Sequence, residues 1–313
     1  MIAPSLSATR IVVTGATGFL GSHLTSRLCA MGGDVHAVSR SERRTERYGP
    51  RWWHGDLADI ATVRGIFEKL RPEVVFHLSG LATARPEREL VLPTLHSLLV
   101  STVNILMAAS ESGCGRVVLA ASLTEPTEGH AEVTPGSPYA AAKWASGAYA
   151  RMFHELYDVP VMMVRPFMTY GPGQDERKLI PYVIHSLLRG EAPKLSSGCQ
   201  QIDWVYIDDV IDGFIAAAMA QDIDGETIDL GSGVLVAIRD VVGVLVRLIN
   251  SEVEPLFGTL PDRPLERVRR ANTDDAYRKL GWKAVTALEM GLESTVAWWR
   301  ERTSVRPKQG DDF

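Results

Sequence analysis

The chain has 313 residues, of which 45% are hydrophobic and 23% are charged, and its formal net charge is −5. This composition supplies enough apolar side chains for one large domain or two modest ones. Acids and bases are interspersed without a long basic stripe, which argues against nucleic acid or a membrane surface as a partner.

The first half of the chain alternates short apolar runs with segments of helical periodicity. Strands that alternate with helices, and that are apolar along their whole length, are typical of a parallel sheet covered on both faces. We therefore expect strands within residues 10–15, 34–40, 51–57, 72–80, 115–122 and 159–166, and helices at 19–32, 61–71, about 90–112 and from Ser137–Pro138 onwards.

The alternation changes after Pro166. A Gly- and Pro-rich segment precedes a helix at about 179–189, and residues 203–220 read as a short strand and a helix that return to the sheet. We expect a dinucleotide-binding domain from residues 1–166 plus about 204–231. Residues 167–203 plus about 232–313 are expected to form a smaller, interleaved α/β substrate-binding lobe.

A glycine-rich turn follows the first strand. Gly15, Gly18 and Gly21 form G-x-x-G-x-x-G, a variant of the usual dinucleotide fingerprint, between an apolar strand and an amphipathic helix. Glycine lets the backbone come close to a pyrophosphate, and the helix N-terminus supplies free N–H groups. We expect the glycines to bind a dinucleotide, together with the intervening Thr17, Phe19 and Leu20.

The second strand ends in residues that bear on cofactor choice. A site that prefers NAD usually has Asp or Glu here, whereas this chain has Ser39 and Arg40, followed by Arg43 and Arg44. A guanidinium can bind a 2′-phosphate through two hydrogen bonds, so we expect NADP(H), with NAD(H) as the alternative. The other interpretation is that these arginines are solvated loop charges.

Asp56 follows the third strand in "HGDLAD". It is placed to receive the adenine amino group, or else it is the N-cap of the next helix. Leu57, next to it, is the other cofactor contact expected in this segment.

In order and spacing together, several motifs resemble the extended short-chain dehydrogenase/reductase family, with its nucleotide-sugar epimerases, dehydratases and ketoreductases. They are "TGATGFLG", "FHLSG", "YAAAK", "RPFMTYGPGQ" and "DWVYIDDV". The resemblance implies a Rossmann-type doubly wound sheet. It implies Tyr139 as acid/base, Lys143 as the group that lowers the tyrosine pKa and binds the nicotinamide ribose, and Ser122 as the residue that orients the substrate oxygen.

A free phenol titrates near pH ~10, so a nearby positive charge is needed before it can exchange protons at neutrality. Spacing of four places Tyr139 and Lys143 on one face of a helix. Thr124 either shares the role of Ser122 or caps a turn, and His77 is more typical of a buried core residue than of a catalyst. By the same resemblance, further cofactor contacts fall at Leu78, Ser79, Gly80, Ala120, Pro166 and Phe167.

The sequence also departs from the family. Leu123 and Thr124 follow Ser122 where dehydratases carry paired acids, and Glu125 is displaced by one position, which argues against a dehydratase. Leu98 stands near the place of a frequent Asn. In the substrate lobe, Ile202 replaces an Arg for the diphosphate, which leaves Arg263 as the matching base and Lys178 as a substitute.

These features favour NADP(H)-dependent reduction of a keto group on a nucleotide-linked deoxysugar, such as a 4-ketoreductase catalyses. Two alternatives stay open: a nucleotide-sugar 4-epimerase with tightly bound NAD, and a non-catalytic dinucleotide sensor. Family enzymes commonly form homodimers through two helices, here 90–112 and the one that carries Tyr139.

The three cysteines lie far apart without metal-ligand spacing, so we expect reduced thiols and no metal. The N-terminus has no apolar segment after a basic start, and no apolar run is expected to be long enough to span a bilayer. A cytoplasmic protein is the prediction.

Overall fold

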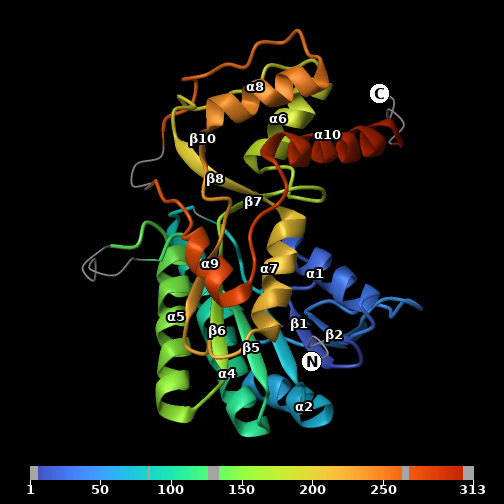
Figure 1. The fold of residues 1–313 in the computed structure, drawn as a ribbon, viewed down its shortest axis with the longest axis vertical. Helices are drawn as coiled ribbons and strands as arrows, with labels where there is room; N and C mark the ends of the chain where they lie inside the picture. The colour runs from blue at the N-terminus through green and yellow to red at the C-terminus, as the bar shows by residue number, and fades with distance from the viewer. Residues whose placement is uncertain (1–5, 84, 126–133, 263–267, 306–313) are drawn as a thin grey trace. The chain divides into compact units, whose positions relative to one another are not determined.

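The computed structural model describes residues 6–83, 85–125, 134–262 and 268–305 (Figure 1). The main sheet has seven parallel strands in the order β3-β2-β1-β4-β5-β6-β9. This Rossmann-type sheet confirms the predicted fold class. Its strands are β1 (Arg10–Thr14), β2 (Asp34–Ser39), β3 (Arg51–His54), β4 (Val74–His77), β5 (Arg116–Ala120), β6 (Val161–Pro166) and β9 (Thr227–Leu230).

Helices cover both faces of the main sheet (Figure 1). On one face lie α2 (Ile60–Leu70), α4 (Ser101–Ser112) and α5 (Pro138–Tyr157). Their apolar side chains and those of the strands form one buried cluster, which includes Phe67, Ile105, Leu106 and Phe153. On the other face lie α1 (Phe19–Ala30) and α7 (Ile207–Met219), which are joined by an ion pair of 2.6 Å between Arg27 and Asp212.

The helix that carries Tyr139 begins where its sequence predicts. Ser137 is extended and its hydroxyl oxygen accepts from the Ala140 N–H at 3.2 Å, and Pro138 occupies the first turn. Both are favourable helix starts, because the first N–H groups lack partners within the helix. Asp158 ends α5 in the left-handed region at φ 53°.

The predicted helix over 90–112 is instead a series of four segments. A 3-10 turn (Arg88–Leu90) leads into α3 (Val91–Thr94), a π-helical stretch (Leu95–Val100) and then α4. By length and composition, the stretch Arg88–Ser112 would suffice to cross a membrane, which corrects the expectation that no segment is long enough. Ile105 and Leu106 from this stretch are buried in the core cluster, whereas Val91 and Leu92 are exposed.

The chain divides into two compact units. The first comprises residues 1–166, 211–230 and 272–283, and it holds the main sheet together with α9 (Thr273–Leu280). The second comprises residues 167–210, 231–271 and 284–313. It contains α6 (Leu179–Leu188), α8 (Ile238–Ile249), α10 (Leu288–Val305) and a three-stranded sheet in the order β10 (Leu235–Ala237), β8 (Gln201–Tyr206), β7 (Met168–Tyr170).

Within residues 203–220, the strand departs from the expectation, whereas the helix α7 does lie on the main sheet. The strand β8 does not return to the main sheet, because it pairs with β7 in parallel and β10 antiparallel. The return to the main sheet is made later by β9, which pairs with β6.

Candidate active site

The glycine turn lies between β1 and α1 and fits tightly against the end of β4. Gly15 has φ +69°, and a methyl group on it would come within 2.7 Å of the backbone of Leu78 and Ser79. A methyl group on Gly21 would come within 2.0 Å of the Gly15 carbonyl oxygen. A side chain is therefore excluded at both positions, and the backbone of the turn stays accessible to a ligand.

The first turn of α1 is suited to an anion. Gly18 is its N-cap, no side chain caps the helix there, and its first turn carries no acidic residue. Thr17 and Gly18 are exposed, while Phe19 and Leu20 are half-buried. Free N–H groups at a helix start are a binding site for phosphate. This turn therefore fits the pyrophosphate of a dinucleotide.

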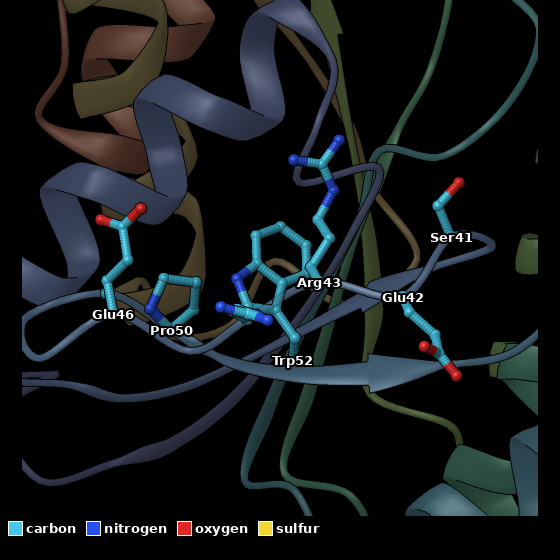
Figure 2. Close-up of a pocket in the computed structure, with 8 residues that line it drawn as sticks. Ser41, Glu42, Arg43, Glu46, Pro50 and Trp52 are labelled. Carbon is cyan, nitrogen blue, oxygen red and sulfur yellow. The ribbon is translucent and has the colours of Figure 1, made fainter.

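The end of β2 carries the residues that bear on cofactor choice. Ser39 is half-buried and its hydroxyl accepts from the Ser41 N–H at 3.1 Å, whereas Arg40 is exposed. Beyond them is a pocket of about 440 Å³ lined by Ser41, Glu42, Arg43, Arg44, Glu46, Gly49, Pro50 and Trp52. Figure 2 shows Arg43 and Trp52 next to one another, with the guanidinium carbon 5.3 Å from the ring centroid.

Asp56 does not cap the helix that follows it. The N-cap of α2 is Asp59, whose carboxylate accepts from the N–H groups of Ala61 and Thr62. Asp56 is exposed and accepts from the Ala58 N–H at 3.0 Å. Leu57 is buried, and its carbonyl accepts from the Asn104 amide at 2.9 Å, which ties this loop to α4.

The end of β4 is fixed by a buried histidine. His77 Nδ1 lies 2.8 Å from the Thr14 hydroxyl and Nε2 lies 3.2 Å from the Thr102 hydroxyl. Burial, and then the Lys143 charge, lower the pKa of His77 to about 3, so the ring is neutral. Two hydroxyl partners and full burial make it a structural residue that holds Leu78, Ser79 and Gly80 in place beside the glycine turn.

Ser122, Tyr139 and Lys143 come together at the carboxyl end of β5. Ser122, in the loop after the strand, lies close enough to the phenol of Tyr139, on the first turn of α5, to lower the pKa of that phenol. Lys143 lies one helical turn further on, is 8% exposed, and donates from Nζ to the Ala120 carbonyl at 2.6 Å. The carboxyl edge of an open α/β sheet is where such folds bind ligands.

Thr124 lies beside this group of residues. Its hydroxyl is 2.9 Å from that of Ser122, and its N–H donates to the Ser122 hydroxyl at 3.2 Å. The hydrogen bond from the Thr124 N–H closes a turn of the kind that serine side chains stabilise. Thr124 is exposed whereas Ser122 is buried, so its hydroxyl can meet a ligand while it fixes the rotamer of Ser122.

Burial controls the electrostatics of these residues. It raises the pKa of Tyr139, and the Ser122 hydrogen bond opposes that rise while the charge of Glu125 adds to it. Burial lowers the pKa of Lys143 to about 8, against the opposing effect of Glu125. The resemblance implies a lowered tyrosine pKa, whereas here burial of the phenol outweighs the opposing effect of Ser122.

Glu125 is the residue of this region whose place the sequence did not reveal. It is 6% exposed, and its Oε1 accepts from the Ser122 N–H at 2.7 Å. The sequence indicated only an acid displaced from the dehydratase position. A buried strand followed by a loop gives no periodic signal for the direction of a loop side chain, so nothing in the pattern predicts this burial.

The remaining predicted residues lie elsewhere. Pro166 ends β6, and the next residue, Phe167, is buried. Lys178 is the exposed N-cap residue of α6, in the second unit, and Ile202 is half-buried in β8, where it pairs with Val236. Arg263 lies outside the described residues.

Known proteins resemble this chain along most of its length. The model of the NAD dependent epimerase/dehydratase family matches residues 11–231. A UDP-glucose 4-epimerase of Mycolicibacterium smegmatis is 31% identical over 316 residues, which cover 94% of this chain and 99% of the relative. The family match includes the glycine turn, Ser122, Tyr139 and Lys143.

Solved structures resemble the fold over the same extent. A UDP-glucose 4-epimerase from Thermotoga maritima, solved with UDP-glucose, has a TM-score of 0.83 at 25% identity and covers 94% of this chain and 99% of its own. MoeE5, solved with UDP-glucose and NAD, has a TM-score of 0.82 at 29% identity, again with 94% and 99% covered.

Proposed function

The chain belongs to the NAD-dependent epimerase/dehydratase family, and we propose that it is a nucleotide-sugar 4-epimerase. It is an enzyme of the extended short-chain dehydrogenase/reductase type. The observation that carries the proposal is the grouping of Ser122, Tyr139 and Lys143 at the carboxyl end of β5, where the Lys143 ammonium donates to the Ala120 carbonyl at 2.6 Å. The UDP-glucose 4-epimerase from Mycolicibacterium smegmatis supports it, because the similarity spans nearly all of both chains.

The residues divide the proton chemistry among themselves. Ser122 orients the sugar 4-hydroxyl, and ionised Tyr139 removes its proton, which leaves a carbonyl once the C4 hydride has departed. Tyr139 then returns the proton when hydride arrives on the opposite face. Lys143 supplies positive charge that favours the phenolate. NAD bound in this site would supply the acceptor and the donor for the C4 hydride.

The cofactor would be held by the glycine turn and the ends of β2, β4 and β5. Gly15, Gly18 and the first turn of α1 take the pyrophosphate, Ser39 and Arg40 take the adenosine ribose, and Lys143 takes the nicotinamide ribose. The lobe that contains Lys178 and Arg263 would bind the nucleotide sugar, and Ile202 removes one positive charge from it.

A second candidate is an NADP(H)-dependent 4-ketoreductase. Its support is the end of β2, which carries an exposed Arg40. A carboxylate at this place would repel a 2′-phosphate, whereas a guanidinium attracts it. The pocket beyond it contains Arg43, whose guanidinium lies over Trp52, and Arg44, together with Glu42 and Glu46. A reductase exchanges its cofactor every turnover, so selection of the phosphorylated, reduced pool would benefit it.

One set of assays distinguishes the two candidates. The epimerase is supported if the purified protein retains NAD(H) and interconverts UDP-glucose and UDP-galactose. Chromatography of the two nucleotide sugars measures this interconversion. An empty protein that binds NADPH and consumes it with a 4-keto nucleotide sugar supports the reductase instead. Absence of both activities over a panel of nucleotide sugars contradicts the proposal.

Tyr139→Phe tests the assignment of the acid/base. Loss of the phenol should reduce kcat by about 10²–10⁴-fold while the cofactor still binds, which is the range for general acid–base catalysis. Tyr277→Phe in α9 is the matched control, because Tyr277 is exposed and should leave kcat unchanged. Equal activities of the two variants would exclude Tyr139 as the acid/base.

We further infer a cytoplasmic homodimer. Exposed apolar side chains lie on α3 and α5, namely Val91, Leu92, Tyr149, Leu156 and Tyr157. Covering these side chains with a second copy would remove apolar surface from water. Sedimentation of the purified protein at twice the mass of the chain is the expected result.

A further inference from the structure

Glu125 is a carboxylate buried beneath Ser122. Its Oε1 accepts from the Ser122 N–H at 2.7 Å. A methyl group on Gly147, in the middle of α5, would lie 3.4 Å from Oε2, so that oxygen faces the helix. The side chain therefore bridges the loop after β5 and α5, and the absence of a side chain at Gly147 leaves room for it.

The charges that face Glu125 come from two elements. Lys143 and Arg151 lie one turn before and one turn after Gly147 on α5, and Arg165 projects from β6. Arg165 also holds Asp229, at 2.8 Å. The Lys143 ammonium is thus close to Glu125, to the Ala120 carbonyl and to neutral His77 on β4.

Tyr139 is faced by the same loop. Ser122 lowers the pKa of its phenol and the charge of Glu125 raises it, while the Thr124 hydroxyl lies 2.9 Å from that of Ser122. Glu125 is buried, with Oε1 at the Ser122 N–H and Oε2 facing Gly147 of α5. Glu125 therefore does not touch the substrate oxygen, and any effect on the reaction passes through Ser122, Tyr139 and Lys143.

We propose that Glu125 is a positioning residue, which fixes the Ser122 backbone and places a negative charge at the site formed by Ser122, Tyr139 and Lys143. The effect of Glu125 on the reaction rests on the proposed function, because it requires that Tyr139 is the acid/base. A negative charge behind the site also helps to hold the proton on the buried Lys143.

The electrostatics of the site agree with this geometry. The charge of Glu125 raises the pKa of Lys143 and of Tyr139. Burial raises the pKa of Glu125 itself, and the Ser122 N–H, Arg165, Lys143 and Arg151 oppose that rise. The Glu125 side chain therefore both orients Ser122 and opposes formation of the Tyr139 phenolate.

Glu125→Gln is the direct test, because Gln keeps the oxygen that accepts from Ser122 and removes the charge. The readout is the phenolate absorbance of Tyr139, taken as the pH titration of each protein minus that of its Tyr139→Phe counterpart. We expect the midpoint to fall by about one pH unit. Glu111→Gln is the matched control, since Glu111 pairs with Arg64 at the surface and should leave the midpoint unchanged.

Two further variants separate charge from shape. Glu125→Ala removes the same charge and leaves room for water at the Ser122 N–H, so its midpoint should also fall even if the Gln variant folds poorly. Glu125→Asp keeps the charge and should restore the midpoint, while the shorter side chain lowers kcat through Ser122. A midpoint that does not move in Gln or Ala, or that moves equally in Asp, would overturn the proposal.

The spectroscopic titration needs no substrate. It therefore tests the effect of Glu125 on Tyr139 even if the protein turns over no sugar. Should epimerase or reductase activity be found, the acidic limb of its pH profile should move to lower pH by the same amount in Glu125→Gln. A change in kcat without any change in the limb would indicate a merely structural role and would contradict the assignment.

Discussion

Lys143 is subject to opposing effects on its proton. Burial lowers its pKa from 10.5 to about 8, and Glu125 opposes the change. In the unfolded chain the ammonium keeps its ordinary pKa, so between pH 8 and 10.5 the unfolded state binds more protons than the folded one. The buried charge therefore costs stability at neutral pH, and this cost is relieved as the pH rises through that window.

Lys143→Met should consequently stabilise the ligand-free protein at pH 7 while it impairs catalysis. Removing the buried ammonium should raise the free energy of unfolding by about 1–3 kcal/mol, part of the gain being lost with the hydrogen bond to Ala120. Urea unfolding measures the change, and kcat should fall at least about 10²-fold.

The control for this substitution is Lys69→Met in α2. Lys69 is exposed, so its replacement should change the free energy of unfolding by less than about 0.5 kcal/mol. A destabilised Lys143→Met would show that the contact with the Ala120 carbonyl outweighs the cost of burying the charge.

At the scale of single residues, spacing predicted some roles and not others. Tyr139 and Lys143 lie four apart on α5, so helical periodicity alone puts them on one face. Ser122 could be placed because it directly follows an apolar strand. The burial of Glu125 depends on Gly147 and Arg165, which are distant in sequence, and so no local pattern contains it.

At the scale of elements, the contact between α1 and the glycine turn depends on backbone clearance. Gly21 faces the Gly15 carbonyl, and its missing Cβ would be 2.0 Å from that oxygen. The obstructing atom is backbone, which cannot rotate away as a side chain would. The helix can therefore pack against its own entry turn only while position 21 is glycine.

Gly21→Ala should accordingly separate α1 from the turn. We expect the free energy of unfolding to fall by about 2–4 kcal/mol, as for overpacking of a backbone contact, and cofactor binding to be lost.

Gly65→Ala in α2 is the matched control, because nothing lies within 4 Å of the added methyl group there. It should raise stability by about 0.5–1 kcal/mol, since Ala is the better helix former. Thermal unfolding with and without NAD measures both; equal effects would refute the packing argument.

The segment from Arg88 to Ser112 shows where element prediction fails. Its apolar periodicity predicts one helix, yet the structure interrupts it with a π-helical stretch. Hydroxyl side chains bond back to carbonyls four residues earlier at Thr94, Ser97, Ser101 and Thr102. Such bonds compete with the helical ladder and bend helices, and an apolar pattern does not register them.

At the scale of the whole molecule, each unit is assembled from separated segments of the chain. Alternation of strands and helices predicted the first six strands of the main sheet in order, because each is local in sequence. The seventh, β9, comes from residue 227 onwards and pairs with β6 at Met163 to Pro166. Sequence patterns locate a strand but do not specify its partner, so β8 was assigned to the wrong sheet.

The interleaving implies that residues 1–166 do not fold alone. Without β9, the edge of β6 exposes unpaired backbone groups, and the half-buried Arg165 loses Asp229. Without residues 211–219 of α7, one face of the sheet exposes apolar side chains that are buried in the intact chain. Exposed sheet edges and faces lead to association between chains.

A fragment of residues 1–166, although it contains the glycine turn, Ser122, Tyr139 and Lys143, should therefore lack cooperative unfolding and cofactor affinity. Circular dichroism during heating should show a broad transition in the fragment and a sharp one in the full chain. NADH fluorescence should change on titration with the full chain alone. If the fragment melts sharply and binds NADH, then β1 to β6 form a self-sufficient domain, and β9 contributes neither to the stability of the sheet nor to the cofactor site.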